Sequence, residues 1–230
     1  MFARYDHSAG KGEPPMKRIL IAVSVEAERE AVLRGAGRDP RFDVRITGAG
    51  SALAAARTAQ LLAGGGYGLA VSAGIAGGFP GKAAIGSVVV ADAIVAADFG
   101  AETADGGFLP VDELGFGSAR IGADRQVAER IAAAIASAGI AAAVGTVLTV
   151  ATATGTAETA AKLAARYPEA AAEGMEGFGV ATAAAAFGVP ALELRAVSNA
   201  VGPRDRSAWR IGEALAALEK ASAILPEVLT

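Results

Sequence analysis

Cysteine is absent from this sequence of 230 residues, and histidine occurs only once, at His7. Without a thiol there is no disulfide, no thiolate nucleophile and no cysteine-ligated metal. Because His7 lies in a polar stretch near the start, most catalytic arrangements built on histidine are excluded, and histidine-ligated metals with them. If the chain is an enzyme, it has to work with carboxylates, arginine, hydroxyls, amides and backbone groups, and we expect no metal.

An excess of basic residues and a long apolar run are missing as well. The 21 Lys and Arg residues against 24 Asp and Glu residues give a formal net charge of −3. This balance argues against a nucleic-acid partner, because such proteins normally carry a basic face. Charges interrupt the longest apolar stretches before they reach the roughly 18 residues of a membrane-spanning helix, and the start lacks the apolar core of a secretion signal. We therefore expect a cytoplasmic protein without a membrane partner.

Strand and helix patterns alternate along the chain. Residues 1–15, rich in glycine, proline and charge, are predicted to be a disordered leader before a single domain over residues 16–230. The predicted strands span residues 18–25, 42–47, 69–73, 87–96, 144–150 and 191–197. The predicted helices span residues 26–33, 52–62, 124–138, 156–166 and about 207–225, while 171–187 combine a strand and a helix and 99–117 are mostly loop. This alternation is typical of an α/β fold with a largely parallel, helix-covered sheet.

A first chemically informative stretch, residues 173–177, puts the carboxylate of Glu176 beside the thioether of Met175 where an alanine-rich helix begins. Glu176 could be an exposed glutamate that the helix dipole favours. It could equally bind the 2′- and 3′-hydroxyls of a ribose, because hydrogen bonds to the 2-hydroxyl strengthen as a departing base leaves an oxocarbenium-like sugar. Met175 would then pack on the sugar face, although a single Met is more often part of a core.

A second stretch, residues 193–199, ends an apolar strand on Arg195, Ser198 and Asn199, and open α/β sheets usually bind ligands at the carboxyl ends of strands. Glu193 and Arg195 share a strand face and could form a structural ion pair, and Asn199 could be a turn former. An amide can also donate to the 6-oxo group of a purine while its oxygen accepts from protonated N7. Because an Asp would better suit a 6-amino purine, Asn199 points to a hypoxanthine- or guanine-like base.

Acidic and glycine-rich segments complete the candidates. Glu26, Glu28 and Glu30 follow the first strand, where one of them could activate water, and their spacing does not choose among them. Residues 48–53 do not match a dinucleotide fingerprint and are expected to form a turn capped by Ser51. The small residues at 74–78 would let a ligand approach the backbone closely, or would form a tight turn.

Four of these segments, in this order, resemble the purine nucleoside phosphorylase and nucleosidase superfamily. They are Val25-Glu26-Ala27-Glu28, Gly74-Ile75-Ala76-Gly77-Gly78, Met175-Glu176-Gly177 and Arg195-Ala196-Val197-Ser198-Asn199. The resemblance covers about residues 17–225 and is closest to the hydrolytic branch that contains the methylthioadenosine/S-adenosylhomocysteine nucleosidases. Within that branch, residues 97–102 and 198–209 look like the futalosine hydrolases of the alternative menaquinone pathway. The resemblance implies a three-layer α/β/α sandwich around a twisted mixed sheet.

The same resemblance implies roles for individual residues. Glu28 would polarise the attacking water with Arg195 as its neighbour, and Asn199 would assist departure of the base. Met175 and Glu176 would hold the ribose, and Ser198 would help to hold the base. Ile75, Ala76, Gly77, Thr152 and Ala153 would line the substrate site, with Ile75 where the methylthioadenosine enzymes carry a serine near the water.

We therefore predict hydrolysis of futalosine to hypoxanthine and dehypoxanthine futalosine, by attack of water at C1′ without a metal or organic cofactor. Candidates for the carboxylated aromatic group beyond the 5′ carbon are Phe99, Arg204, Arg206 and Trp209, although Arg204 and Asp205 could instead cap and brace the last helix. The helices rich in small residues are consistent with self-association, and the resemblance to the superfamily implies a homodimer or a larger homo-oligomer.

Three alternatives remain at this point. The first is a nucleosidase of the methylthioadenosine/S-adenosylhomocysteine type. The second is a phosphorolytic purine nucleoside phosphorylase, which needs an Arg or Lys for phosphate near the glycine-rich segments; residues 74–80 contain none, and Lys82 is the nearest. The third is a nucleoside-binding sensor without catalysis, which would not need a water-activating acid.

Overall fold

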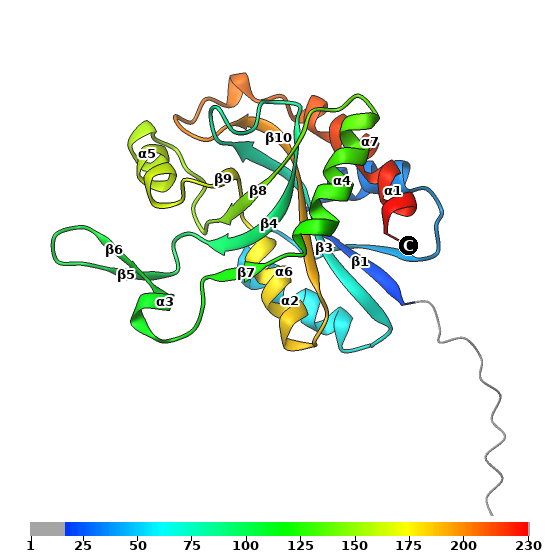
Figure 1. Ribbon diagram of the computed structural model, residues 1–230, viewed down its shortest axis with the longest axis horizontal. Coiled ribbons are helices and arrows are strands. Elements are labelled where there is room, and N and C mark those ends of the chain that lie inside the picture. The colour runs from blue at the N-terminus through cyan, green and yellow to red at the C-terminus, as the bar shows by residue number, and fades with distance from the viewer. Residues whose placement is uncertain (1–16, 230) are drawn as a thin grey trace, which may run out of the picture.

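In the computed structural model, which describes residues 17–229, helices cover both faces of an eight-stranded sheet (Figure 1). The leader predicted over residues 1–15 lies outside the described residues. Parallel and antiparallel neighbours both occur in the sheet. The predicted α/β class, with a mixed sheet between layers of helices, is therefore confirmed.

The sheet is partly closed on itself. Its strands are β1 (Arg18–Val23), β2 (Phe42–Ile46), β3 (Tyr67–Gly78), β4 (Val88–Ala96), β7 (Arg120–Gly122), β8 (Ala142–Thr149), β9 (Ala170–Gly174) and β10 (Ala191–Ala200). They run in the order β10, β4, β8, β9, β3, β1 and β2, with β7 on β4. Because β10 also pairs with β3, the strands β10, β4, β8, β9 and β3 form a ring that brings distant segments together.

Helices on the two faces bury separate parts of the core. One layer contains α1 (Glu26–Ala36), α4 (Arg125–Ser137) and α7 (Ile211–Val228), and the other contains α2 (Ser51–Leu62) and α6 (Gly177–Ala186), while α5 (Ala157–Arg166) lies beside β8 and β9 (Figure 1). Fully buried Ile21, Leu194 and Leu218 belong to the core of the first layer. Over residues 17–229, no helix is long and apolar enough to cross a membrane.

Strand β3 is longer than predicted, since it continues through the glycine-rich residues 74–78. A Cβ atom at Gly74 would lie 2.5 Å from Glu28 Oε1 and 2.8 Å from Arg195 Nη1, so this glycine makes room for buried charges. A Cβ at Gly78 would collide with the Ala83 carbonyl. The alternative that these glycines form a tight turn is wrong, because close packing across the sheet requires them.

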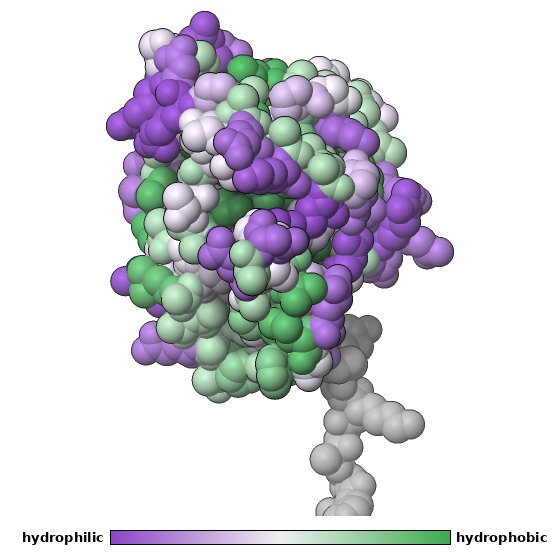
Figure 2. Space-filling model, turned by 90° about the vertical axis from the view of Figure 1, so that its left-hand side faces the viewer, coloured by the Kyte–Doolittle hydropathy of each residue, from purple (hydrophilic) through white to green (hydrophobic). Residues whose placement is uncertain are grey.

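The segment predicted to be mostly loop contains short elements. A hairpin of β5 (Gly100–Glu102) and β6 (Phe108–Pro110) leads into α3 (Val111–Leu114). Strand β7 follows and was not predicted, because three residues are too few to show a strand period. Phe99 and Phe116 are 48% and 83% exposed here, and hydrophobic residues gather in the lower part of this side of the molecule (Figure 2).

The starts of α4 and α2 differ in whether a side chain caps them. Asp124 caps α4 by accepting from the amides of Gln126 (2.9 Å) and Val127 (3.1 Å). Helix α2 instead begins after Gly50, whose φ is 85°, and has no side-chain cap. The predicted turn is present there, but the predicted cap by Ser51 is wrong.

The last helix begins later than predicted. A separate 3₁₀ turn, η1, spans Arg206–Ala208, and α7 begins only at Ile211. Asp205 accepts from the amide of Ser207 at 3.0 Å and so caps this turn. The alternative that Asp205 caps the last helix is therefore wrong.

Candidate active site

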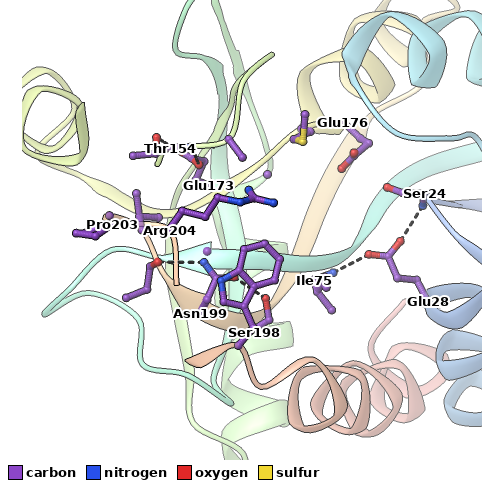
Figure 3. A pocket seen from close by; sticks show the side chains of 18 of the residues that line it. Ser24, Glu28, Ile75, Thr154, Glu173, Glu176, Ser198, Asn199, Pro203 and Arg204 are labelled. Atoms are coloured by element: carbon purple, nitrogen blue, oxygen red, sulfur yellow. Dashed lines mark hydrogen bonds between the residues drawn. The ribbon is translucent and has the colours of Figure 1, made fainter. Parts of the chain in front are cut away.

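A cavity of about 260 Å³ lies at the carboxyl ends of β3, β9 and β10 (Figure 3). Sheet strands of α/β proteins usually present ligand sites at this end. Most of the residues predicted from the sequence line it, namely Glu28, Ile75, Gly77, Ala153, Met175, Glu176, Ser198 and Asn199. The fold therefore brings together segments that are far apart in the chain, from Glu28 near its start to Asn199 near its end.

Glu28 is the glutamate of the first helix that faces the cavity. It is 3% exposed, and its Oε2 accepts from the amides of Ser24 (2.8 Å) and Val25 (3.3 Å) while Oε1 accepts from the amide of Ile75 (2.9 Å). The other two candidate acids, Glu26 and Glu30, point to solvent. Glu26 pairs with Arg29 at 2.8 Å, and Glu30 lies 4.0 Å from Arg34. Of the three acids that the sequence left open, the structure places Glu28 in the cavity.

Arg195 lies beneath the cavity, not on its lining. It is 1% exposed, and its Nε donates to Glu193 Oε1 at 2.8 Å, so the predicted ion pair is confirmed. Its Nη2 donates to Glu176 Oε2 and to Ser72 Oγ, both at 3.1 Å. The residue sits within β10 and does not end it, since the strand continues to Ala200.

These contacts form a buried cluster of two carboxylates and one guanidinium, and the carboxylate of Glu28 lies close by, since a Cβ at Gly74 would meet both Glu28 Oε1 and Arg195 Nη1. Burial opposes the charge of Arg195, but the carboxylates of Glu193, Glu176 and Glu28 raise its pKa, so it stays a cation. Burial raises the pKa of Glu193 in spite of its pairing with Arg195, and among the described residues no group donates to its Oε2. The cluster holds more acid than base.

Glycines make this cluster sterically possible. A Cβ at Gly174 would lie 3.1 Å from Arg195 Cζ, and one at Gly177 would collide with both carboxylate oxygens of Glu193. Gly177 is also the first residue of α6, so the helix begins directly against this carboxylate. The glycines on either side of Met175-Glu176 are therefore needed for the charges below them.

Glu176 immediately precedes α6, is 7% exposed and lines the cavity. Its Oε1 accepts from the amide of Gly50 at 3.1 Å, and its Oε2 accepts from Arg195. The alternative of an exposed glutamate at a helix start is therefore wrong. Met175, half-buried beside it, lies on the cavity lining and not in the core.

Ser198 and Asn199 both face the cavity because β10 is irregular there. Adjacent residues of a regular strand point to opposite faces, but the pairing of β10 with β3 shifts between Val197 and Asn199, which leaves Ser198 as an extra residue. The Ser198 hydroxyl lies 2.8 Å from Asn199 Oδ1 and 3.2 Å from the Ala76 carbonyl, and Asn199 Nδ2 donates to the Ala200 carbonyl at 3.0 Å. Since Asn199 lies in a strand, the turn-former alternative is wrong.

Besides Arg195, two other predicted residues lie just outside the cavity lining. Ala76 is buried and contributes its carbonyl to Ser198. Thr152 lines a neighbouring hollow together with Asp98, Lys162 and Arg166, and Ala153 and Thr154 separate the two spaces because they line both.

Glu173 also lines the cavity, although no role was predicted for it from the sequence. It is 8% exposed, and its Oε1 accepts from the amide of Thr154 at 2.9 Å while its Oε2 lies 2.5 Å from the Thr154 hydroxyl. Burial raises the pKa of this carboxyl. The signal in the sequence is a carboxylate within the otherwise apolar strand Ala170–Gly174.

The candidates for a substrate carboxylate separate into two groups. Arg204 and Trp209 line the cavity, and the guanidinium of Arg204 lies 5.3 Å from the centre of the Trp209 ring and extends toward the cavity (Figure 3). Arg206 lies 5.9 Å from the same ring, outside the lining. Phe99 also lies outside it and packs against Phe178, with ring centres 6.4 Å apart.

Comparisons with known proteins agree with the resemblance found in the sequence. A family model described as the phosphorylase superfamily matches residues 31–230. The futalosine hydrolase of Streptomyces coelicolor is 54% identical, over 92% of this chain and 96% of that protein. That of Acidothermus cellulolyticus is 46% identical, over 91% and 90%. The structure of futalosine hydrolase from Helicobacter pylori superposes with a TM-score of 0.74 at 19% identity, over 93% of this chain and 97% of that one.

Proposed function

Since this chain belongs to the phosphorylase superfamily, and within it to the futalosine hydrolase family, we propose that it hydrolyses the N-glycosidic bond of futalosine. The products are hypoxanthine and dehypoxanthine futalosine. The observation that carries the proposal is the arrangement of the cavity, in which Glu28 and Glu176 lie at one end and Asn199 lies at the other (Figure 3).

The ribose binds at the acidic end. The Glu176 carboxylate accepts hydrogen bonds from the 2′- and 3′-hydroxyls, and Met175 packs on the sugar face. Because Arg195 pairs with Glu176 at 3.1 Å, it holds this carboxylate in one orientation. These hydrogen bonds strengthen as the sugar gains oxocarbenium character, and so they lower the barrier to loss of the base.

Glu28 activates the water. An ionised carboxylate offers about four acceptor positions, and backbone amides take three of those on Glu28. The remaining position is free to accept from a water molecule near C1′. As the C1′–N9 bond breaks, its electron pair goes to the base; as the water oxygen bonds to C1′, its proton passes to Glu28.

Asn199 stabilises the leaving base. A proton from solvent on N7 turns the leaving anion into neutral hypoxanthine, and Asn199 Oδ1 accepts from that N7–H while Nδ2 donates to the 6-oxo group. Ser198 orients the amide through its hydrogen bond to Oδ1. An adenine base would present its amino group to the donor Nδ2, which is a mismatch. This disfavours a methylthioadenosine-type nucleosidase.

The remaining alternatives are less well supported. A phosphorylase needs a cation for phosphate close to the sugar. The cation at this end, Arg195, is buried beneath the lining and paired with Glu193 and Glu176. Lys82 lies outside the cavity lining. A binding protein without catalysis would have no use for a buried acid held by three amides.

Base release from futalosine, inosine and methylthioadenosine, each with and without phosphate, tests the proposal. We expect hypoxanthine from futalosine at a rate that phosphate does not change, and little adenine from methylthioadenosine. Rapid release of adenine, or a strict requirement for phosphate, would overturn it.

Further parts of the proposal extend beyond the reaction. Futalosine carries a carboxylate beyond its 5′ carbon, and we propose that Arg204 and Trp209, which line the cavity, bind it. The exposed Phe99 and Phe116 support a homodimer or larger homo-oligomer. A role in menaquinone biosynthesis follows from the proposed substrate. The single domain over residues 16–230 and the cytoplasmic location stay predictions.

A further inference from the structure

Three cavity residues form one row across the sheet. In the strand pairing, Gly77 of β3 lies opposite Glu173 of β9 on one side and opposite Asn199 of β10 on the other. All three line the cavity. Neighbouring strands lie about 4.8 Å apart, so the Cα atoms of Glu173 and Asn199 are separated by about 10 Å. The row therefore places a carboxylate and an amide on either side of a glycine.

Gly77 provides a floor without a side chain between them. A Cβ at this position would lie 2.9 Å from Val201 Cγ2 and 3.4 Å from Asn199 Nδ2, and so would intrude between the amide and its neighbours. A planar base can lie over such a floor with one edge toward each side chain. Figure 3 shows Glu173 and Asn199 at the same end of the cavity, away from Glu28 and Glu176.

On the basis of the proposed function, we propose that Glu173 determines the base specificity by accepting a hydrogen bond from N1–H of the 6-oxopurine. A 6-oxopurine has a donor at N1, whereas a 6-aminopurine has an acceptor there. A carboxylate next to N1 therefore attracts hypoxanthine and repels adenine. Together with Asn199, which reads N7 and the 6-oxo group, it reads the base on both sides of C6.

The surroundings of Glu173 suit an acceptor. Thr154 donates to each carboxylate oxygen, through its amide at 2.9 Å and its hydroxyl at 2.5 Å, and thereby fixes the plane of the carboxylate. Each oxygen keeps a second lone pair. Because the group is 8% exposed, a base that fails to donate leaves it poorly solvated, which makes the discrimination large.

The test compares Glu173→Gln with Glu169→Gln. Glu169 just precedes β9, is exposed and pairs with Arg120 at 2.9 Å, so it supplies the same substitution outside the cavity. In Glu173→Gln the Thr154 amide takes the carbonyl oxygen, and the NH2 group turns the side facing N1 from acceptor to donor. We expect the ratio of kcat/KM for futalosine to that for its 6-amino analogue to fall about 10- to 100-fold, with no change in Glu169→Gln.

A ligand-side measurement keeps the proposal testable if Glu173→Gln does not fold. Wild-type protein should bind hypoxanthine about tenfold or more tightly than 1-methylhypoxanthine, which keeps N7 and the 6-oxo group but lacks N1–H. Equal affinity for the two bases would overturn the proposal. So would a Glu173→Gln variant that loses activity equally on both substrates, since this would make Glu173 only an anchor for the loop at Thr154.

The two proposals fail in different ways. If wild-type protein does not release hypoxanthine from futalosine, the proposed function is wrong. Discrimination between the two free bases would still test the assignment of Glu173.

Discussion

The two ends of the cavity are built differently. At the sugar end, carboxylates are held by backbone amides and by one buried guanidinium, so that Glu28 and Glu176 have charged or rigid partners. At the base end, Glu173 and Asn199 have only neutral partners, namely Thr154, Ser198 and a backbone carbonyl. The sugar end is suited to stabilising developing charge and the base end to reading hydrogen-bond patterns.

The largest expected effect tests the sugar end. Glu28→Gln should lower kcat about 100- to 10,000-fold, because it removes the acceptor for the proton of the attacking water. Binding of hypoxanthine should persist, since the base contacts the other end. The matched control is Glu26→Gln, an exposed residue two positions away that pairs with Arg29. An unchanged kcat in Glu28→Gln would remove Glu28 from the mechanism.

Removal of the shared guanidinium should affect folding as well as activity. Arg195→Met leaves the buried carboxylates of Glu193 and Glu176 without their partner, and we expect a loss of about 3–5 kcal/mol in the free energy of unfolding, measured with urea. Arg120→Met breaks the exposed pair with Glu169 and should cost at most about 1 kcal/mol. Similar losses in the two variants would contradict the difference between a buried cluster and a surface pair.

At the base end, substitution should change specificity more than rate. Asn199→Asp supplies an acceptor for the 6-amino group, and it should lower the preference for futalosine over its 6-amino analogue about 10- to 100-fold. Combined with Glu173→Gln, it should favour the 6-amino substrate. A double variant that retains the wild-type preference in kcat/KM would show that other groups read the base.

A smaller effect is expected from the arginine on the cavity lining. Arg204→Gln should raise KM for futalosine about tenfold by removing a charged partner for the substrate carboxylate, while affinity for free hypoxanthine stays the same. Arg206→Gln is the control, because Arg206 stacks on the same Trp209 ring from outside the lining. Equal changes in KM in both variants would mean that the effect acts through Trp209.

Sequence patterns predicted the fold well where they had a clear period. The apolar run of β10 and the two-residue spacing of Glu193 and Arg195 predicted a strand and its ion pair, and Asp124 marked the start of α4. The prediction ended strand β3 too early because glycines interrupt its apolar pattern. The reason for those glycines, namely buried charges from other elements, is not visible locally.

The site was predicted less completely for the same reason. The choice of Glu28 over Glu26 depends on backbone amides that include Ile75, far away in the chain. Ser198 and Asn199 share a face only because of a bulge. The position of Glu173 beside Gly77 depends on an antiparallel pairing between β3 and β9, which an alternating α/β pattern does not predict.

Hydrolysis of futalosine in heavy-oxygen water, with and without phosphate, tests the central claim most directly. If the acidic end delivers water to C1′, the heavy oxygen appears on the sugar product, the hypoxanthine stays unlabelled, and phosphate changes nothing. A sugar 1-phosphate, or a sugar product without the label, would contradict the account.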